Sequence, residues 1–339
     1  MRLAVAAIAT CLPAERAHDS LLGTVIPHTY GHLYDPAGNH SRPPTVRRGA
    51  TRMYSAPYRA PTAADDVRTS DLASDAVAAA LASLAGSAGA GIDTVFHTHC
   101  TLDQHLLDST CLRIESDHAP QARHRMSVGQ LGTAGVPTTL RLAAGVTRAL
   151  ACVSASDKWL APMVRRVPGV VIYGDASAAC VVGAPGSVAA PLALIEAIET
   201  VCMPPAHSLW SAAPDVQRSY LADLAGSAIE RLLARQPGLV RAGVALAGDD
   251  YGAAFADALQ ARCRLGGPCL DGTHTGIHLS SAAPLFALAR VIAAAGEHAR
   301  QAVIWTASTA GHAAAMLVTV PARPPRTPDH CHQGKGESA

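Results

Sequence analysis

Two segments of the sequence follow the same plan, and this repetition limits the folds open to the chain. GVVIYGDASAACVVG begins at Gly169 and QAVIWTASTAGHAAAMLVTV begins at Gln301. Each contains an apolar strand-like run, a turn of small residues and a second apolar run. Helix-like and strand-like segments alternate before both. A repeat at this separation predicts two similar α/β halves that face each other.

The composition agrees with a layered α/β body. The chain has 339 residues, of which 49% are hydrophobic and only 4% aromatic, so alanine and glycine supply much of the apolar content. Small residues let helices and strands approach closely, and the chain is long enough to bury a large core. The formal net charge of +1, with no basic stripe, argues against a nucleic-acid partner. No internal run is long and apolar enough to predict a membrane span.

The predicted organisation is an N-terminal half at 1–185, a C-terminal half at 186–321 and a disordered, Pro-rich tail at 322–339. In the first half, TSDLASDAVAAALASLAG predicts a helix capped by Ser70 or Asp71. IDTVFHTHC, which starts at Ile92, predicts the strand that follows.

The beginning of the chain can be interpreted in two ways. MRLAVAAIATCLPAE has one Arg and a short apolar run, as a signal peptide does, and IATC is close to a lipoprotein box. We favour a first β-strand that ends at Pro13. The nine cysteines include no C-x-x-C pair, which favours a reduced, cytoplasmic protein over a disulfide framework.

The segment MSVGQLGTAGVPTTLRLA, from Met126 to Ala143, predicts a strand, a glycine-rich turn and a helix. Such a turn often presents a nucleophile at the N-terminus of the helix. Thr133 stands at this turn between Gly132 and Gly135, with no Cys or Ser. A threonine hydroxyl is a poor nucleophile unless a base takes its proton.

Taken in order, these segments resemble the thiolase fold and, more narrowly, the ketoacyl-acyl-carrier-protein synthase III group. The resemblance extends over roughly residues 1–321. It rests on the opening strand that ends in LPAE and on TSDLASDAVAAAL, GTAG, VSASDKWLAP, YGDASAACVVG and GIHLSSAAPLFALA. It implies an α-β-α-β-α layered body and, as donor substrate, an acyl group on coenzyme A or on an acyl carrier protein. It implies no bound cofactor.

The resemblance also implies an altered site. The family's nucleophilic Cys falls on Thr133, or on Gly132 when the alignment is made from the strand. The condensing His falls near Leu246–Asp250, where this chain has no His. In the second-half motif His278 is kept, and Ala283 stands at the position of the family's Asp. This pattern is closer to the branch that transfers acyl groups to oxygen or nitrogen than to the condensing branch.

We expect Thr133 to act as nucleophile or pocket floor and His278 to act as general base. Without the carboxylate, His278 needs another partner to fix its tautomer. The candidates on the same loop are Asp271, His274 and Ser281. The other predicted oxyanion or pocket residues are Gln130, Gly132, Ser281 and His274.

Two alternatives remain open for this site. In one, His278 deprotonates the acceptor for direct attack, and the amides of Gly132 and Thr133 hold the oxyanion. In the other, Thr133 is a packing residue in a pseudo-active site.

Two further clusters contain residues that could bind a ligand. Arg47, Arg48 and Arg52 could contact a carrier protein or a coenzyme A phosphate, or could form a solvated loop. HTHCTLDQH, from His97 to His105, could ligate a metal. We favour polar packing or pocket lining there and predict no metal. YGDAS, from Tyr173, is interpreted as structural because no phosphate-binding motif accompanies it.

The predicted function is an acyltransferase of specialised metabolism. It would move an acyl group from a carrier-protein or coenzyme A thioester to an oxygen or nitrogen acceptor. The alternatives are a non-catalytic partner subunit of an active homologue and a divergent condensing enzyme. We expect a homodimer that buries the strand around VFHTHC, with a heterodimer as the alternative.

Overall fold

The computed structural model describes residues 2–13, 15–17, 59–61, 67–84, 91–101, 109–159, 166–167, 170–205, 209, 212–270, 277–296 and 299–322. The predicted tail from 323 onward, Arg47, Arg48, Arg52, His105, Asp271 and His274 lie outside these ranges. Among the described residues, no helix has both the length and the apolar character needed to cross a membrane.

One nine-stranded sheet runs through both halves in the order β11-β13-β14-β10-β1-β9-β6-β4-β5. The first half supplies β1 (Leu3–Cys11), β4 (Ile92–His99), β5 (His124–Gly129), β6 (Leu150–Asp157) and β9 (Ala176–Gly183). The second supplies β10 (Ala193–Cys202), β11 (Ala245–Gly248), β13 (Arg300–Ala307) and β14 (His312–Val320). The opening apolar run forms a strand, as predicted, and this strand, β1, is central in the sheet and pairs with β9 and β10.

The two halves repeat one pairing pattern. β6 pairs antiparallel with β9 and parallel with β4, and β13 pairs antiparallel with β14 and parallel with β11. The sequence repeat predicted that the run before YGDAS is the strand of the first half equivalent to β13. This prediction was wrong. That run forms β8 (Val171–Tyr173), which joins β7 (Arg166–Val167) and β12 (Ile277–His278) in a separate small sheet. The pairing of the strands shows instead that β6 is the strand equivalent to β13. The sequence does not specify this pairing.

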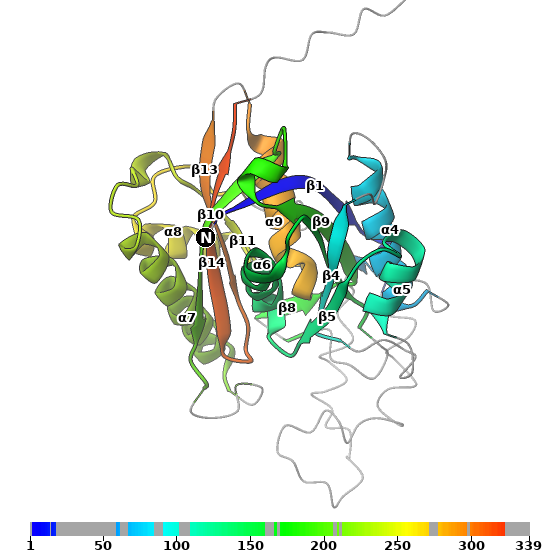
Figure 1. Ribbon diagram of the computed structural model, residues 1–339. Coiled ribbons are helices and arrows are strands. Elements are labelled where there is room, and N and C mark those ends of the chain that lie inside the picture. The colour runs from blue at the N-terminus through cyan, green and yellow to red at the C-terminus, as the bar shows by residue number, and fades with distance from the viewer. Residues whose placement is uncertain are drawn as a thin grey trace, which may run out of the picture.

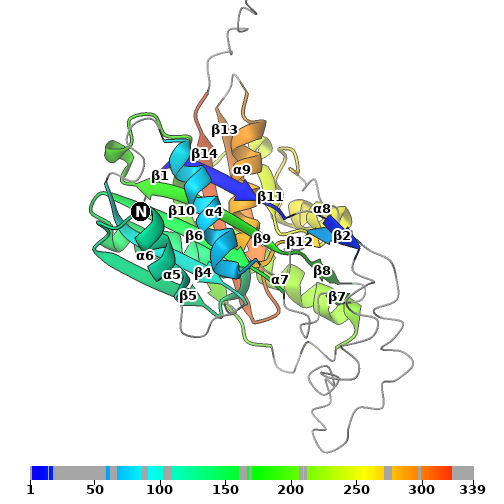
Figure 2. The same ribbon diagram turned by 90° about the vertical axis from the view of Figure 1, so that its right-hand side faces the viewer.

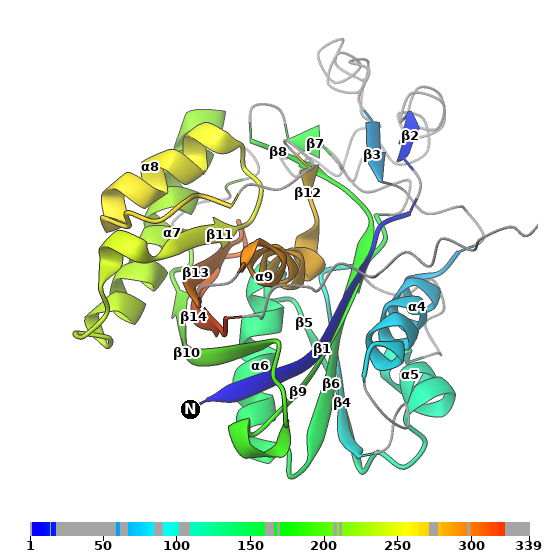
Figure 3. The ribbon, with the colours of Figure 1, turned by 90° about the horizontal axis from the view of Figure 1, so that it is seen from above.

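Layers of helices alternate with the strands of the two halves, so that the molecule has five layers, α-β-α-β-α (Figures 1 and 3). α4 (Thr69–Ala82) and α5 (Thr110–His118) cover one outer face, and α7 (Pro214–Ala234) and α8 (Ala253–Cys263) cover the other. α6 (Gly135–Val146) and α9 (Ala283–Ala294) lie between the two halves. Three apolar clusters fill the spaces between these layers. The structure confirms the predicted thiolase-like α/β fold.

Alanines let α4 approach the sheet. Ala73, Ala76 and Ala80 have no exposed surface and pack with residues of β1 and β9, and Figure 2 shows α4 lying across these strands. The helix begins one residue before the predicted cap. Arg68 is the N-cap, and its backbone N–H donates to Asp71 Oδ2 at 2.7 Å. Asp71 thus stabilises the start of α4 from its first turn.

Candidate active site

Thr133 lies where the two halves meet, in the single turn Gly132–Ala134 that leads into α6. It is only 2% exposed. The turn places Gly132 at φ 55° and Gln130 at φ 62°. A Cβ on Gly132 would clash with the Ser308 side chain, so this close approach requires glycine. Gln130 is exposed.

The hydroxyl of Thr133 donates to Asp249, not to His278. Thr133 Oγ1 lies 3.0 Å from Asp249 Oδ2. The same oxygen accepts from Thr306 Oγ1 at 2.8 Å and from the Ala307 amide at 2.9 Å. Asp249 is 5% exposed and directly follows β11. Its position gives the buried carboxylate three fixed donors.

Asp249 is a residue of this candidate site that the sequence did not predict. It lies within Leu246–Asp250, where only the absence of the condensing His was noted. The available signal was an acidic side chain directly after a buried strand, at the position expected to hold that His.

His278, on β12, is 2% exposed and also faces Asp249. Its Nε2 lies 3.4 Å from Asp249 Oδ2, and its Nδ1 accepts from the Ser280 amide at 3.0 Å. Because Nδ1 is an acceptor, the neutral ring carries its proton on Nε2, which lies close to the carboxylate but forms no hydrogen bond with it. The carboxylate therefore stands between the hydroxyl and the imidazole.

The partner that fixes the His278 ring is the Ser280 backbone, which adopts φ 48°. Of the three predicted partners, only Ser281 lies within the described residues. Its amide donates to Asp157 Oδ2 at 2.8 Å, and its hydroxyl donates to the Thr98 carbonyl at 3.3 Å. Ser281 thus connects His278's loop to the first half rather than bonding to the imidazole.

Asp157, at the end of β6, holds this junction together. It has no exposed surface, and its Oδ1 accepts from the amides of Cys100 and Thr101 at 2.7 and 2.6 Å. Its Oδ2 accepts from Ser281. Burial and the charge of Asp157 raise the pKa of the Cys100 thiol well above its usual range. Cys100 is therefore a thiol rather than a thiolate near neutral pH.

Aromatic rings enclose the imidazole, although the chain has few of them. Tyr173 meets His278 edge-on with ring centroids 5.4 Å apart, and Tyr251 is tilted against it at 5.0 Å. Trp159 stacks on Tyr173 at 4.3 Å and donates from Nε1 to Ser280 Oγ at 3.0 Å. Burial raises the pKa of both tyrosines above their usual range. Their phenols stay neutral at physiological pH.

Polar atoms without hydrogen-bond partners gather around the Thr133 turn. Within the described ranges, Asp249 Oδ1, His278 Nε2, Ser308 Oγ and Thr98 Oγ1 are buried and have none. Ser308 lies against Gly132, and Thr98 lies against Gly135. Unpaired buried polar groups cost free energy and are rare in folded proteins. Their concentration at one turn suits a polar ligand.

Asp249 also lines a small cavity with Gly248, Trp305, Arg290 and the first turn of α8. Its volume is about 70 Å³, which is enough to hold water. Arg290 donates from Nη2 to the Gly248 carbonyl at 3.0 Å across this space.

The predicted histidine cluster packs on β4. His97 and His99 stack with ring centroids 5.5 Å apart, and His97 Nδ1 bonds to Ser154 Oγ at 3.0 Å. Burial, with a smaller effect of His99, lowers the pKa of His97 to about 3. In the parts of the chain with described coordinates, no three His, Cys, Asp or Glu side chains form a metal-binding group.

The strand expected at a dimer interface, β4, is the second strand from one edge of the nine-stranded sheet. β4 pairs with β5 on one side and β6 on the other. β5 is the strand at this edge of the nine-stranded sheet, and His124, Arg125 and Ser127 on it are exposed.

The fold is similar to that of several solved proteins of the ketoacyl synthase III type. ChlB3, described as an acyltransferase, aligns with a TM-score of 0.70 and 15% identity over 96% of this chain and 100% of its own. FabH, the 3-oxoacyl-(acyl carrier protein) synthase III of Pseudomonas aeruginosa PAO1, gives 0.66 and 16% over 96% and 100%. AbyA1, described as a tetronic acid condensing enzyme, gives 0.61 and 17% over 94% and 99%. No family model and no curated protein matches the sequence.

Proposed function

We propose that this protein is an acyltransferase that moves an acyl group from a thioester to an oxygen or nitrogen acceptor. The observation that carries the proposal is the cluster of Thr133, Asp249 and His278 with the unpaired polar atoms around the start of α6. The fold shared with ChlB3 and FabH supports a thioester donor, carried by coenzyme A or by a carrier protein. The acyl group and its thiol arrive as substrate, so the proposed reaction needs no bound cofactor.

Acyl transfer fits the side chains better than carbon–carbon condensation. Condensation builds negative charge on an enolate oxygen, and the family supplies hydrogen-bond donors to it. The segment to which the resemblance assigns the condensing His, Leu246–Asp250, contains Asp249 and no His, and an ionised carboxylate there would repel that charge. Transfer to a protic acceptor needs a group that removes a proton, and a carboxylate can do this.

The test is intact-protein mass after incubation with a panel of acyl thioesters on coenzyme A and on phosphopantetheinylated carrier proteins. We expect an acyl adduct on the wild type that disappears in Thr133→Ala. No adduct, with product formed by the wild type and lost in His278→Ala, would indicate direct transfer. Neither adduct nor product with any donor and acceptor would contradict the proposal.

A second candidate is a non-catalytic partner of an active homologue. Its supporting observation is that Thr133 and His278 are each only 2% exposed, with Tyr173 and Tyr251 packed on the imidazole. Co-expression with a homologue that keeps the catalytic cysteine tests it. A stable complex whose activity is unchanged by Thr133→Ala would favour this candidate.

A further inference from the structure

We propose that Asp249 is the catalytic base of the transfer and that His278 is a positioning residue that acts through it. The inference rests on the proposed function and concerns the reacting groups of the same site. It assigns to a carboxylate the proton transfer that the resemblance would give to His278.

The first argument is the direction of the hydrogen bonds. The Thr133 proton already points at Asp249 Oδ2, over 3.0 Å. The His278 nitrogen that faces this site, Nε2, carries a proton because Nδ1 accepts from the Ser280 amide. A protonated nitrogen cannot accept the Thr133 proton, so the neutral imidazole in this tautomer is a donor and not a base.

The second argument is the unequal use of the two carboxylate oxygens. Oδ2 receives Thr133, Thr306 and the Ala307 amide. Oδ1 is buried and has no partner among the described residues. Because only Oδ2 is engaged in hydrogen bonds, Oδ1 is available for a second proton donor. A base that serves both Thr133 and an acceptor requires such a second oxygen.

The proton balance closes over two half-reactions. Thr133 Oγ1 attacks the thioester carbonyl carbon while its proton moves to Asp249 Oδ2. The C–S bond then breaks, and the leaving thiolate takes that proton. In the second half, the O–H or N–H acceptor attacks the Thr133 ester and gives its proton to Oδ1. The bond between the acyl carbon and Oγ1 breaks, and Thr133 recovers a proton from Asp249.

His278 acts on this sequence through its Nε2–H, which lies 3.4 Å from Asp249 Oδ2 without forming a hydrogen bond to it in this structure. This contact orients the carboxylate and offsets its charge while Thr133 is acylated. The fixed Ser280 amide holds the tautomer. Removing His278 should therefore slow the reaction without abolishing it.

The decisive variant is Asp249→Asn. Its amide oxygen replaces Oδ2 as a hydrogen-bond acceptor and its NH₂ replaces Oδ1, so the shape of the site is kept while the base is lost. The probe is p-nitrophenyl acetate, which reports hydroxyl nucleophilicity without a physiological thioester. The readouts are p-nitrophenolate release and the acetyl mass on Thr133, with Thr133→Val as background. Asp223→Asn, an exposed carboxylate paired with Arg262, is the matched control.

We expect acetylation of the wild type and Asp223→Asn, and a loss of about 100-fold in Asp249→Asn. His278→Gln should lose about tenfold. Sodium formate, but not sodium chloride, should restore reaction in Asp249→Ala, because a small carboxylate can replace the missing base. ¹⁵N NMR, assigned with His278→Gln, should show His278 protonated at Nε2.

Wild-type reactivity in Asp249→Asn would overturn the inference, as would an Nδ1-protonated His278. Failure of the wild type to exceed Thr133→Val would also overturn it. If the wild type reacts at Thr133 through Asp249 but uses no thioester, the inference stands and the proposed function fails. The two failures are therefore distinguishable.

Discussion

Thr133 and Asp249 are 116 residues apart in the sequence and are joined by a hydrogen bond of 3.0 Å between buried side chains. One comes from the turn before α6 in the first half, and the other follows β11 in the second. The candidate site therefore exists only where the two halves are packed together. Variants that disturb this packing should affect both stability and chemistry.

Gly132→Ala should destabilise the protein by about 1–3 kcal/mol, because alanine disfavours φ 55° and its Cβ would meet Ser308. Urea unfolding measures the effect. Gly145→Ala in α6 is the control, since no atom lies near the added Cβ and alanine favours helix by about 0.5–1 kcal/mol. Ser308→Gly in the Gly132→Ala background should recover only the steric part. Equal changes in the free energy of unfolding for Gly132→Ala and Gly145→Ala would contradict this account.

Thr306→Val should cost about 1–3 kcal/mol, because it removes a donor to the buried Asp249 carboxylate and keeps the side-chain shape. Thr139→Val is the matched comparison. Thr139 is also buried, but its hydroxyl has no partner in the described structure, so valine there should be neutral or stabilising. Free energies of unfolding from denaturant titration test the difference, which should disappear if the Asp249 contact contributes nothing.

Acid should destabilise the fold through His97. Its pKa in the folded protein, about 3, lies below the usual histidine pKa of 6.5, so the unfolded state binds a proton first as the pH falls. This loss of stability begins near the unfolded pKa and grows by about 1.4 kcal/mol per pH unit until the folded pKa is reached. His97→Gln should flatten the dependence of unfolding free energy on pH between 6.5 and 4. Parallel curves for the two proteins would refute the assignment.

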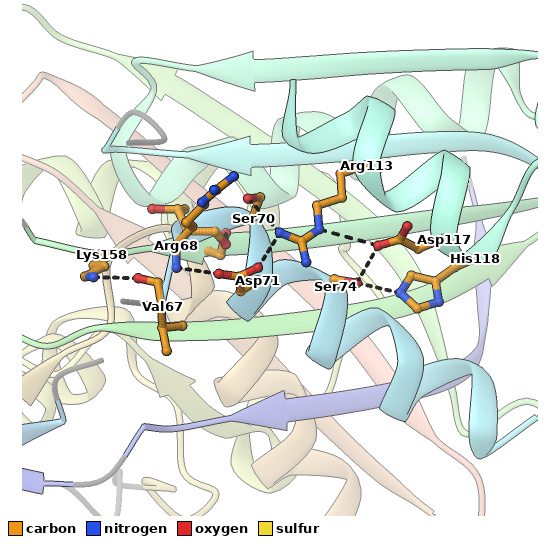
Figure 4. A network of polar contacts seen from close by, with 11 residues as sticks. Val67, Arg68, Ser70, Asp71, Ser74, Arg113, Asp117, His118 and Lys158 are labelled. Atoms are coloured by element: carbon orange, nitrogen blue, oxygen red, sulfur yellow. Dashed lines mark hydrogen bonds and ion pairs between the residues drawn. The ribbon is translucent and has the colours of Figure 1, made fainter. Parts of the chain in front are cut away.

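Asp157→Asn should lower the free energy of unfolding strongly, whereas Asp117→Asn should change it little. Asp157 accepts backbone donors on both oxygens and is fully buried, so an amide NH₂ would face an N–H, at a cost of about 3 kcal/mol. Asp117 belongs to the partly exposed network of Arg113, Asp71 and Ser74 between α4 and α5 (Figure 4). A partly exposed ion pair such as Arg113–Asp117 contributes about 0–1 kcal/mol to the stability of the fold. Thermal and urea unfolding of both variants give the comparison, and similar losses would contradict it.

The layered fold was predictable because its signals are local and repeated. Apolar runs with small residues define β1, β9, β13 and β14, and alanine-rich periodicity defines α4. The pairing of β13 with β14 agreed with the sequence pattern. The equivalence of β13 with β6 did not, because hydrophobic patterning identifies strands but not their neighbours in the sheet.

By itself, the sequence determined the class of fold, the glycine-bounded turn at Thr133 and the histidine at position 278. Only the tertiary structure decided which groups meet there. Asp249 reaches Thr133 because the two halves pack against each other. The Ser280 amide sets the His278 tautomer through a backbone conformation that no motif encodes. Local patterns record which residues are buried or turn, whereas the direction of a hydrogen bond depends on the relative placement of distant segments.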